Sequence, residues 1–149
     1  MEAHEKRSLR ILLVDDDHDT VTLLVRLLAQ SGHRVHAAQC CDTALDLARD
    51  SRYDVLLCDL AMRGRDGYEV LKEVRALHPI RAVAITGCGK PETAAKVAEA
   101  GFEALLPKPL DMDRLNAVLE MIALEIDLAR CFQNEPRLTD RAAVAQGAA

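Results

Sequence analysis

The sequence predicts an α/β fold in which a five-stranded parallel sheet is covered by helices on both faces. Half of the 149 residues are hydrophobic and 29% are charged, the balance of one globular domain rather than of a disordered chain. Short aliphatic, β-branched runs alternate five times with helical patterns. Because parallel strands are joined by right-handed helical crossovers, this alternation predicts a doubly wound sheet.

The first two strand–helix units open the chain. An apolar run over Leu9–Val14 predicts a strand, and the helix predicted over Asp17–Ser31 carries its apolar residues on one stripe and stops before Gly32. A short strand over Arg34–Ala38 and a helix over Asp42–Asp50 form the second unit.

The third unit is predicted to lie inside the sheet. Its strand, Asp54–Cys58, is largely apolar, which is typical of a strand buried on both faces. The helix that follows is predicted over Gly67–Leu77, where Pro79 stops it.

The last two units close the domain. Their strands are predicted at Ala82–Ile85 and Phe102–Leu106, with a helix over Glu92–Ala100 between them. The final helix is predicted from about Asp111 to about Ala129, roughly two turns longer than covering the sheet requires.

The domain is predicted to span residues 9–130, between an N-terminal tail of residues 1–8 and a flexible C-terminal tail of residues 131–149. A net charge of -5 and only four aromatic residues of the Phe, Tyr and Trp type argue against binding of nucleic acid. No apolar run approaches the length of a membrane span, and the start of the chain lacks a signal peptide. A cytoplasmic protein is therefore expected.

Polar residues follow four of the five predicted strands. Asp15 and Asp16 follow the first strand, Asp59 the third, Thr86 the fourth and Lys108 the fifth. In a doubly wound sheet, functional residues gather at the carboxyl ends of the strands. We therefore expect these carboxylates, the hydroxyl and the ammonium to converge at one edge.

These residue types suit phosphoryl transfer. Two carboxylates about 4 Å apart repel by on the order of 4 kcal/mol at an effective dielectric of 20, so a cation has to offset them. Oxygen ligands select Mg²⁺ or a similar hard ion, and a lysine adds a positive charge that suits phosphate. An aspartate in such a site can accept the phosphoryl group covalently.

Four segments carry a family resemblance. Leu12–Asp17, Asp59–Met62 with Asp66-Gly67, Ile85–Gly87 and Pro107–Pro109 resemble, in this order and spacing, the receiver domain of bacterial two-component response regulators. The resemblance covers residues 9 to about 124. It implies a receiver of the single-domain or hybrid-kinase type. It implies a flavodoxin-like sheet with strand order 2-1-3-4-5.

The resemblance also assigns roles. Asp59 is expected to accept the phosphoryl group, while Asp15, Asp16, Asp59 and the backbone carbonyl of Ala61 are expected to bind Mg²⁺ or Mn²⁺. Thr86 is expected to hydrogen-bond the phosphoryl group in the active state. Lys108 is expected to pair with it, and the peptide bond from Lys108 to proline is expected to be cis.

Partners follow from the same resemblance. The donor is expected to be a sensor histidine kinase or a phosphotransfer protein, and the output is expected to be a contact with a downstream protein. A homodimer through the last two strand–helix units is a further expectation. The domain is not expected to be an enzyme beyond its own Mg²⁺-dependent phosphorylation and slow dephosphorylation.

Three departures from the family pattern affect the mechanism. Leu105 stands at the switch position, three residues before the lysine, where the family usually has an aromatic residue. Arg63 replaces the common proline after Met62, which predicts a more mobile loop. Ala61 and Cys88 cannot position an attacking water, so we expect phosphorylated Asp59 to be long-lived.

Two alternatives remain open from the sequence. The run from Asp17 to Val21 is similar to the nucleophile motif of haloacid-dehalogenase-like phosphatases, although Asp17 lies beyond the strand end and helix capping is the better interpretation of Asp17 and Asp19. The other alternative is a receiver-shaped adaptor that binds its partners without being phosphorylated.

Overall fold

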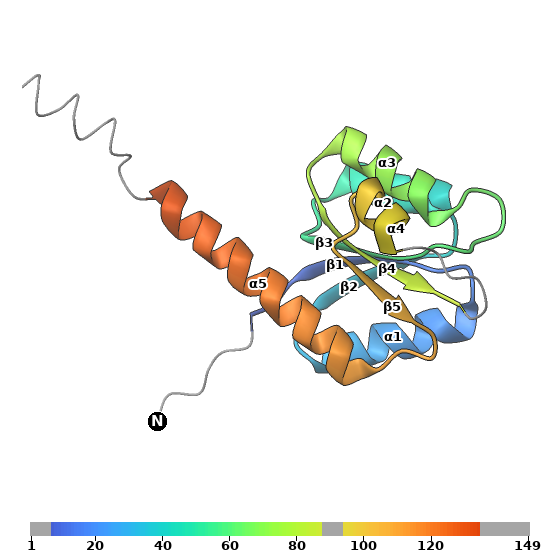
Figure 1. Cartoon of the computed structure of the whole chain (residues 1–149), viewed down its shortest axis with the longest axis horizontal. Coiled ribbons are helices and arrows are strands. Elements are labelled where there is room, and N and C mark those ends of the chain that lie inside the picture. The colour runs from blue at the N-terminus through green and yellow to red at the C-terminus, as the bar shows by residue number, and fades with distance from the viewer. Residues whose placement is uncertain (1–6, 88–93, 135–149) are drawn as a thin grey trace, which may run out of the picture.

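The computed structural model describes residues 7–87 and 94–134, in which five strands alternate with five helices (Figure 1). In chain order the elements are β1 (Arg10–Val14), α1 (His18–Gln30), β2 (Arg34–Ala38), α2 (Cys41–Asp50), β3 (Val55–Asp59), α3 (Gly67–Leu77), β4 (Arg81–Thr86), α4 (Ala94–Ala100), β5 (Ala104–Pro107) and α5 (Met112–Asn134).

The sheet has the order β2-β1-β3-β4-β5, and every neighbouring pair is parallel. Both the predicted fold class and the predicted strand order are therefore confirmed. β1 and β3 lie side by side, with Val14 opposite Cys58 at their carboxyl ends. This pairing brings together the two segments that were expected to supply the carboxylates.

Helices cover both faces of the sheet (Figure 1). On one face α1 and α5 pack through a cluster that includes Leu28, Leu115 and Leu119. On the other face α2, α3 and α4 pack through a second cluster that includes Leu45 and Leu71. Strand side chains alternate between the two clusters, so the sheet is buried from both sides, as a parallel sheet requires.

Most predicted boundaries lie within two residues of the observed ones. Asp59 and Thr86 were predicted to follow their strands but are the last residues of β3 and β4, because the ladder continues to the pairs Asp59–Ile85 and Thr86–Pro107. The predicted start of the fourth helix, at Glu92, lies outside the described residues.

The end of α5 differs most from the prediction. The helix was expected to end near Ala129 but continues to Asn134, so residues 131–134 of the predicted tail are helical. No glycine or proline occurs in this stretch before Pro136, and the residue preceding a proline disfavours helical backbone. The remaining tail residues, 1–6 and 135–149, lie outside the described residues.

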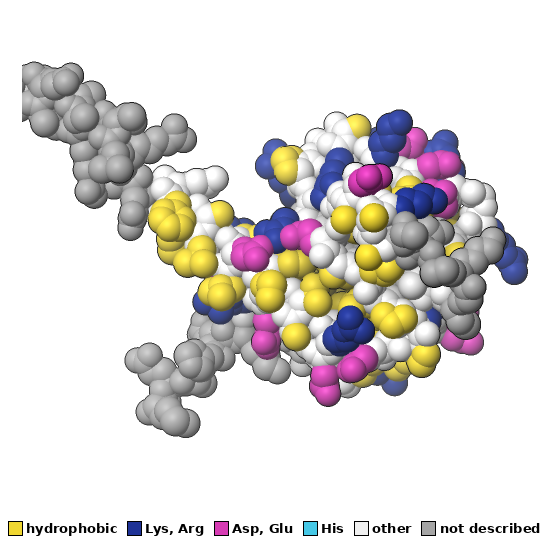
Figure 2. All heavy atoms as spheres, viewed as in Figure 1, with side chains coloured by type: hydrophobic (Ala, Val, Ile, Leu, Met, Phe, Trp, Pro, Cys, Tyr) yellow, Lys and Arg dark blue, Asp and Glu magenta, His cyan; other side chains and the backbone are white. Residues whose placement is uncertain are grey.

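The C-terminal half of α5 projects beyond the edge at which the strands begin (Figure 1). It carries an apolar stripe, visible as a row of hydrophobic side chains along the projecting helix in Figure 2. The stripe consists of Met121, Leu124, Leu128 and Phe132, whose exposed fractions are 43–71%. Within the described part of the chain, no helix is both long and apolar enough to cross a membrane.

A glycine brings α3 close to the end of β3. Gly67 is the first residue of α3, after Asp66, whose side chain caps the helix by accepting a hydrogen bond from the Glu69 amide at 3.0 Å. A Cβ atom on Gly67 would lie 2.5 Å from the carbonyl oxygen of Asp59 and 3.0 Å from the Cα of Leu60. Only a residue without a side chain permits this approach.

We predict that Gly67→Ala destabilises the protein by about 1–3 kcal/mol, because the added methyl group must push α3 away from the end of β3. Urea unfolding of both proteins measures the change. Gly87→Ala is the matched control, since a Cβ atom at Gly87 would meet no atom of the described residues within 4 Å. Equal losses in the two variants would contradict the close-approach argument.

Candidate functional site

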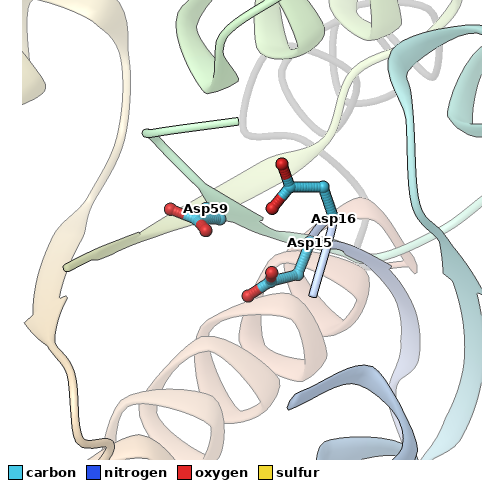
Figure 3. A group of neighbouring side chains, drawn as sticks. All are labelled: Asp15, Asp16 and Asp59. Carbon is cyan, nitrogen blue, oxygen red and sulfur yellow. The ribbon is translucent and has the colours of Figure 1, made fainter. Parts of the chain in front are cut away.

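Three carboxyl groups gather where β1 and β3 end (Figure 3). Asp15 and Asp16 directly follow β1, and Asp59 is the last residue of β3. One carboxylate oxygen from each residue lies within 4.8 Å of the others. Asp15 is fully buried, Asp59 is 4% exposed and Asp16 is half-buried. The convergence predicted from the sequence is confirmed for these three residues.

A backbone amide holds one oxygen of each carboxylate. The amide of Asp17 donates to Asp15 Oδ1 at 2.9 Å, and the amide of Ala61 donates to Asp59 Oδ1 at 3.0 Å. The amide of Arg63 donates to Asp16 Oδ2 at 3.0 Å. The three side chains are thereby oriented by the loops that follow β1 and β3.

Lys108 brings the positive charge to this cluster. Its Nζ lies 3.0 Å from Asp15 Oδ2 and donates a hydrogen bond to Asp59 Oδ2 at 3.1 Å. The Lys108 amide donates to the carbonyl of Thr86 at 2.8 Å, which ties the end of β5 to the end of β4. The expected cis peptide bond between Lys108 and Pro109 is confirmed.

Asp15 Oδ2 is a buried atom with an incomplete environment. The ammonium of Lys108 is close enough for an ion pair, but its direction does not make a hydrogen bond to this oxygen. Buried carboxylate oxygens without hydrogen bonds are costly, because they have lost their water and gained no full replacement. The oxygen is therefore available to a further ligand.

Three carboxylates lie around one ammonium, and their charges and burial shift the pKa values of the site. Burial raises the pKa of Asp15, although the Asp17 amide and Lys108 oppose the shift. Burial alone lowers the pKa of Lys108, but Asp15 and Asp59 outweigh it, so that the pKa is raised. Burial, and then the nearby carboxylates, also raise the pKa of the Cys58 thiol. The cluster keeps an excess of negative charge.

This donor set fits a hard divalent cation. It offers only oxygen atoms, it is negatively charged, and Asp15 Oδ2 lacks a hydrogen bond.

The other residues singled out in the sequence lie around the cluster. Thr86 Oγ1 donates to the Gly87 carbonyl at 3.2 Å and, among the described residues, makes no hydrogen bond to the carboxylates. Leu105 is half-buried against the core on the α2, α3 and α4 face. Ala61 is exposed and contacts Asp59 through its amide. The structure thus places Thr86 beside Lys108, from whose amide its carbonyl accepts a hydrogen bond, and Leu105 against the core, and it joins neither side chain to the carboxylates.

Sequence reasoning missed the contribution of Arg63. The loss of proline at this position suggested a more mobile loop, but the amide of Arg63 hydrogen-bonds Asp16. Proline has no amide N–H and could not make this contact. The signal was present in the sequence, because replacing proline by any other residue restores a donor.

Asp17 is committed to the helix start. Its side chain accepts hydrogen bonds from the amide and hydroxyl of Thr20, and these bonds lower the pKa of Asp17. Neither Asp17 nor Asp19 belongs to the acidic cluster among the described residues. Helix capping by Asp17 is confirmed, and the phosphatase alternative loses the nucleophile on which it depended.

Comparisons with known proteins agree with this geometry. The family model of the response regulator receiver domain matches residues 11–120. The transcriptional regulatory protein ZraR of Escherichia coli is 40% identical over 111 residues, which are 74% of this chain and 25% of ZraR. The transcriptional regulatory protein CpxR of the same organism is 36% identical over 113 residues, which are 76% of this chain and 48% of CpxR.

Among solved structures, a two-component response regulator from Clostridium difficile superimposes with a TM-score of 0.72 at 23% identity, covering 78% of this chain and 96% of that one. This likeness concerns the fold alone. The chain spans about a quarter of ZraR and about half of CpxR.

We predict that the charge on Asp15 destabilises the metal-free protein. A raised pKa means that the folded state binds the proton more tightly than the unfolded chain, in which Asp15 has its ordinary pKa of 3.8. The contribution of Asp15 to stability is therefore complete below that value and is lost as pH rises through the folded pKa.

The free energy of unfolding of the wild type and of Asp15→Ala is compared in EDTA between pH 4 and 7. The packing that Asp15→Ala removes costs the same free energy at every pH. The way in which the difference between the two unfolding free energies changes with pH therefore reports the ionisation of Asp15. The difference is expected to shift in favour of Asp15→Ala as pH rises, and Mg²⁺ is expected to reverse the shift. A shift of the opposite sign in EDTA would disprove the prediction.

Proposed function

We propose, on the premise that this chain belongs to the response regulator receiver domain family, that it is a phosphorylation switch whose acceptor is Asp59. A receiver domain is a signalling module rather than a catalytic enzyme. The observation that carries the proposal is the position of Asp59, at the end of the central strand, in the acidic cluster and 3.1 Å from Lys108.

The proposed reaction is a transfer between two side chains. A carboxylate oxygen of Asp59 attacks the phosphorus of a phosphohistidine on a sensor histidine kinase or phosphotransfer protein. The new P–O bond forms as the P–N bond breaks, and the imidazole nitrogen keeps the electron pair and takes up a proton. Lys108 is placed to pair with the incoming phosphoryl oxygens, because its ammonium already contacts Asp59.

Asp15, Asp16 and Asp59, with the backbone carbonyl of Ala61, are the proposed ligands of Mg²⁺ or Mn²⁺. When bound, the ion supplies positive charge that neutralises the carboxylates and the transferred group. The protein's own contribution is to fix the three side chains with the amides of the following loops. Preorganisation of this kind reduces the cost of assembling charge at the moment of transfer.

The readout is proposed to start at Thr86. Its hydroxyl donates to the neighbouring Gly87 carbonyl, so that a bond to a phosphoryl group on Asp59 requires the side chain to turn. Leu105 lacks the ring that usually follows this movement. We therefore propose that the surface formed by α4, β5 and α5 signals through small displacements to a downstream protein in the cytoplasm.

A homodimer through the last two strand–helix units is the proposed assembly. The apolar stripe of α5 (Met121, Leu124, Leu128 and Phe132) supports it. These side chains expose on the order of 400 Å² of apolar surface, about half of the ~800 Å² per partner of a stable interface. The stripe alone thus supports a weak contact between two copies, and surface from α4 and β5 has to be added to it. A contact of this strength suits regulation by phosphorylation.

We predict that a small acyl phosphate with Mg²⁺ labels the protein with about one phosphoryl group per chain, on Asp59. Intact-mass spectrometry measures the label. Asp59→Asn is expected to remain unlabelled, and EDTA is expected to prevent labelling of the wild type. The label is expected to outlast minutes, because Ala61 offers no polar group to position a water.

Three outcomes would count against this proposal. A folded but unlabelled wild-type protein would favour the phosphorylation-independent adaptor. Continuous release of phosphate would favour a hydrolase. Loss of the label within seconds would contradict the expected slow dephosphorylation.

We predict that Leu128→Glu weakens self-association, because a carboxylate would have to be buried in the dimer contact. Sedimentation velocity of the phosphorylated protein is expected to show a dimer for the wild type and a monomer for the variant. Leu23→Glu is the control, since Leu23 is equally exposed but lies on α1. A monomeric wild type at all concentrations, or equal loss in both variants, would rule out the stripe as the contact.

A further inference from the structure

A hollow lies at the edge of the sheet opposite the acidic cluster, where the strands begin. It has a volume of about 630 Å³ and is lined by four arginines, Arg10, Arg34, Arg52 and Arg130. Arg10 and Arg34 are the first residues of β1 and β2, Arg52 precedes β3, and Arg130 lies on the projecting part of α5. One side of the hollow is thus supplied by α5, which continues past this edge of the sheet (Figure 1).

The hollow has more positive charge than its surroundings neutralise. Asp54 is the acidic residue in its described lining, which leaves a formal excess of three positive charges. Asp54 is itself committed: its Oδ2 accepts a hydrogen bond from the Arg10 amide at 2.8 Å, and its Oδ1 lies 3.9 Å from the Arg130 guanidinium. Little of its charge is left for the other arginines.

Some arginine side chains of the protein are paired and others are not, and three of the unpaired ones line this one hollow; the side chains of Arg26, Arg63 and Arg114 are also unpaired among the described residues but lie elsewhere. Arg49, Arg65 and Arg81 each form an ion pair with a carboxylate. Within residues 7–87 and 94–134, the side chains of Arg34 and Arg52 form neither a hydrogen bond nor an ion pair, and the same holds for Arg10. The chain has 24 acidic residues and a net charge of -5, yet three arginines in one hollow have no partner among the described residues.

Helix ends account for part of this arrangement. The carboxyl ends of α1 and α2 point to this edge, and their partial negative charge favours nearby cations by about 0.3–1 kcal/mol each. That attraction lowers the cost of placing arginines here. It does not supply the hydrogen-bond acceptors that guanidinium groups seek, since each group has five donors.

An adjoining hollow of about 320 Å³ supplies an independent observation. It shares Arg52 with the first hollow and is also lined by His78, which is only 9% exposed. His78 Nδ1 lies 3.1 Å from the carbonyl of Pro79, whereas Nε2 has no hydrogen-bond partner in the described structure. A buried polar atom without a partner, beside the unpaired Arg52, indicates that a ligand completes this region.

We propose that this edge binds a small polyanion carrying two or three phosphate groups. Planar guanidinium groups bind phosphate oxygens in pairs, and the lining contains arginine but no lysine. Two or three phosphates match the excess charge, because a terminal phosphate carries roughly −1.5 to −2 at neutral pH. The volume lies in the range of small-molecule sites, about 300–1,000 Å³.

The same features favour a small ligand over a macromolecule. Tyr53, the aromatic residue in the described lining, is 7% exposed and offers no face on which a base could stack. A concave site with four converging arginines suits a compact anion better than an extended acidic segment. By contacting Arg130 together with Arg10 and Arg34, the ligand would tie the α5 projection to the sheet.

The test is isothermal titration of the whole chain with inorganic tripolyphosphate and, separately, with ATP. EDTA is present throughout, so that no metal can hold phosphate at the acidic cluster. The wild type is expected to bind both probes, more weakly as salt rises. The double variant Arg34→Ala/Arg52→Ala is expected to bind at least tenfold more weakly.

The matched control removes two exposed arginines elsewhere, in Arg26→Ala/Arg114→Ala, and is expected to bind like the wild type. The melting temperature of each variant shows that it is folded, and the single variants replace the double variant if the latter unfolds. Equal affinity for the two probes would assign recognition to the phosphates alone, whereas tighter binding of ATP would add its nucleoside.

Three results would overturn the proposal. The wild type could fail to bind either probe at millimolar concentration. The control variant could lose as much affinity as the cavity variant, which would show general charge attraction. A polyglutamate peptide or a single-stranded DNA could bind more tightly than tripolyphosphate through the same arginines, which would make this edge a macromolecular contact.

Discussion

The ion pair network of Lys108 with Asp15 and Asp59 is the constraint on which the rest of the site depends. Two buried carboxylates lie close enough to repel each other, and the lysine is the cation that contacts both. One ammonium cannot neutralise two carboxylates and the adjacent Asp16. The protein therefore keeps an unbalanced negative charge at the carboxyl ends of its central strands. This imbalance favours a divalent cation and opposes an anionic phosphoryl group until a cation is bound.

The fold supplies the geometry for that imbalance. Because β1 and β3 are neighbours at the point where the strand order reverses, residues 44 positions apart in the chain meet at one edge. The loops after these strands then donate one amide to each carboxylate. Gly67 allows α3 to start against the backbone of Asp59 and so closes one side of the site. Stability and function compete here. The features that orient the carboxylates also hold them close together, and the carboxylates repel one another.

Much of this was predictable from the sequence, and the failures have physical causes. Strand ends and the acidic cluster were predicted because side-chain periodicity and parallel topology constrain them jointly. The end of α5 was predicted too early. Its apolar periodicity weakens past the sheet, but no residue before Pro136 breaks the helix. The Arg63 contact was missed because the loss of proline was interpreted as a loss of rigidity, and the amide that any other residue supplies was not considered. The arginine hollow was missed because its lining comes from segments far apart in the chain.

The two edges of the sheet have opposite charge, and distance limits how they can influence each other. A five-residue strand is about 17 Å long, which exceeds the screening length of about 8–10 Å at moderate salt. Direct electrostatic coupling between the acidic cluster and the arginine hollow is therefore weak. Three elements connect the two regions: β1 runs from Arg10 to the residue before Asp15, β3 runs from the residue after Asp54 to Asp59, and α5 follows the Lys108 loop and carries Arg130. β1 and β3 are held inside the sheet by neighbours on both sides, whereas α5 covers one face and projects beyond it, so α5 is the element whose position a ligand at one edge can change most easily.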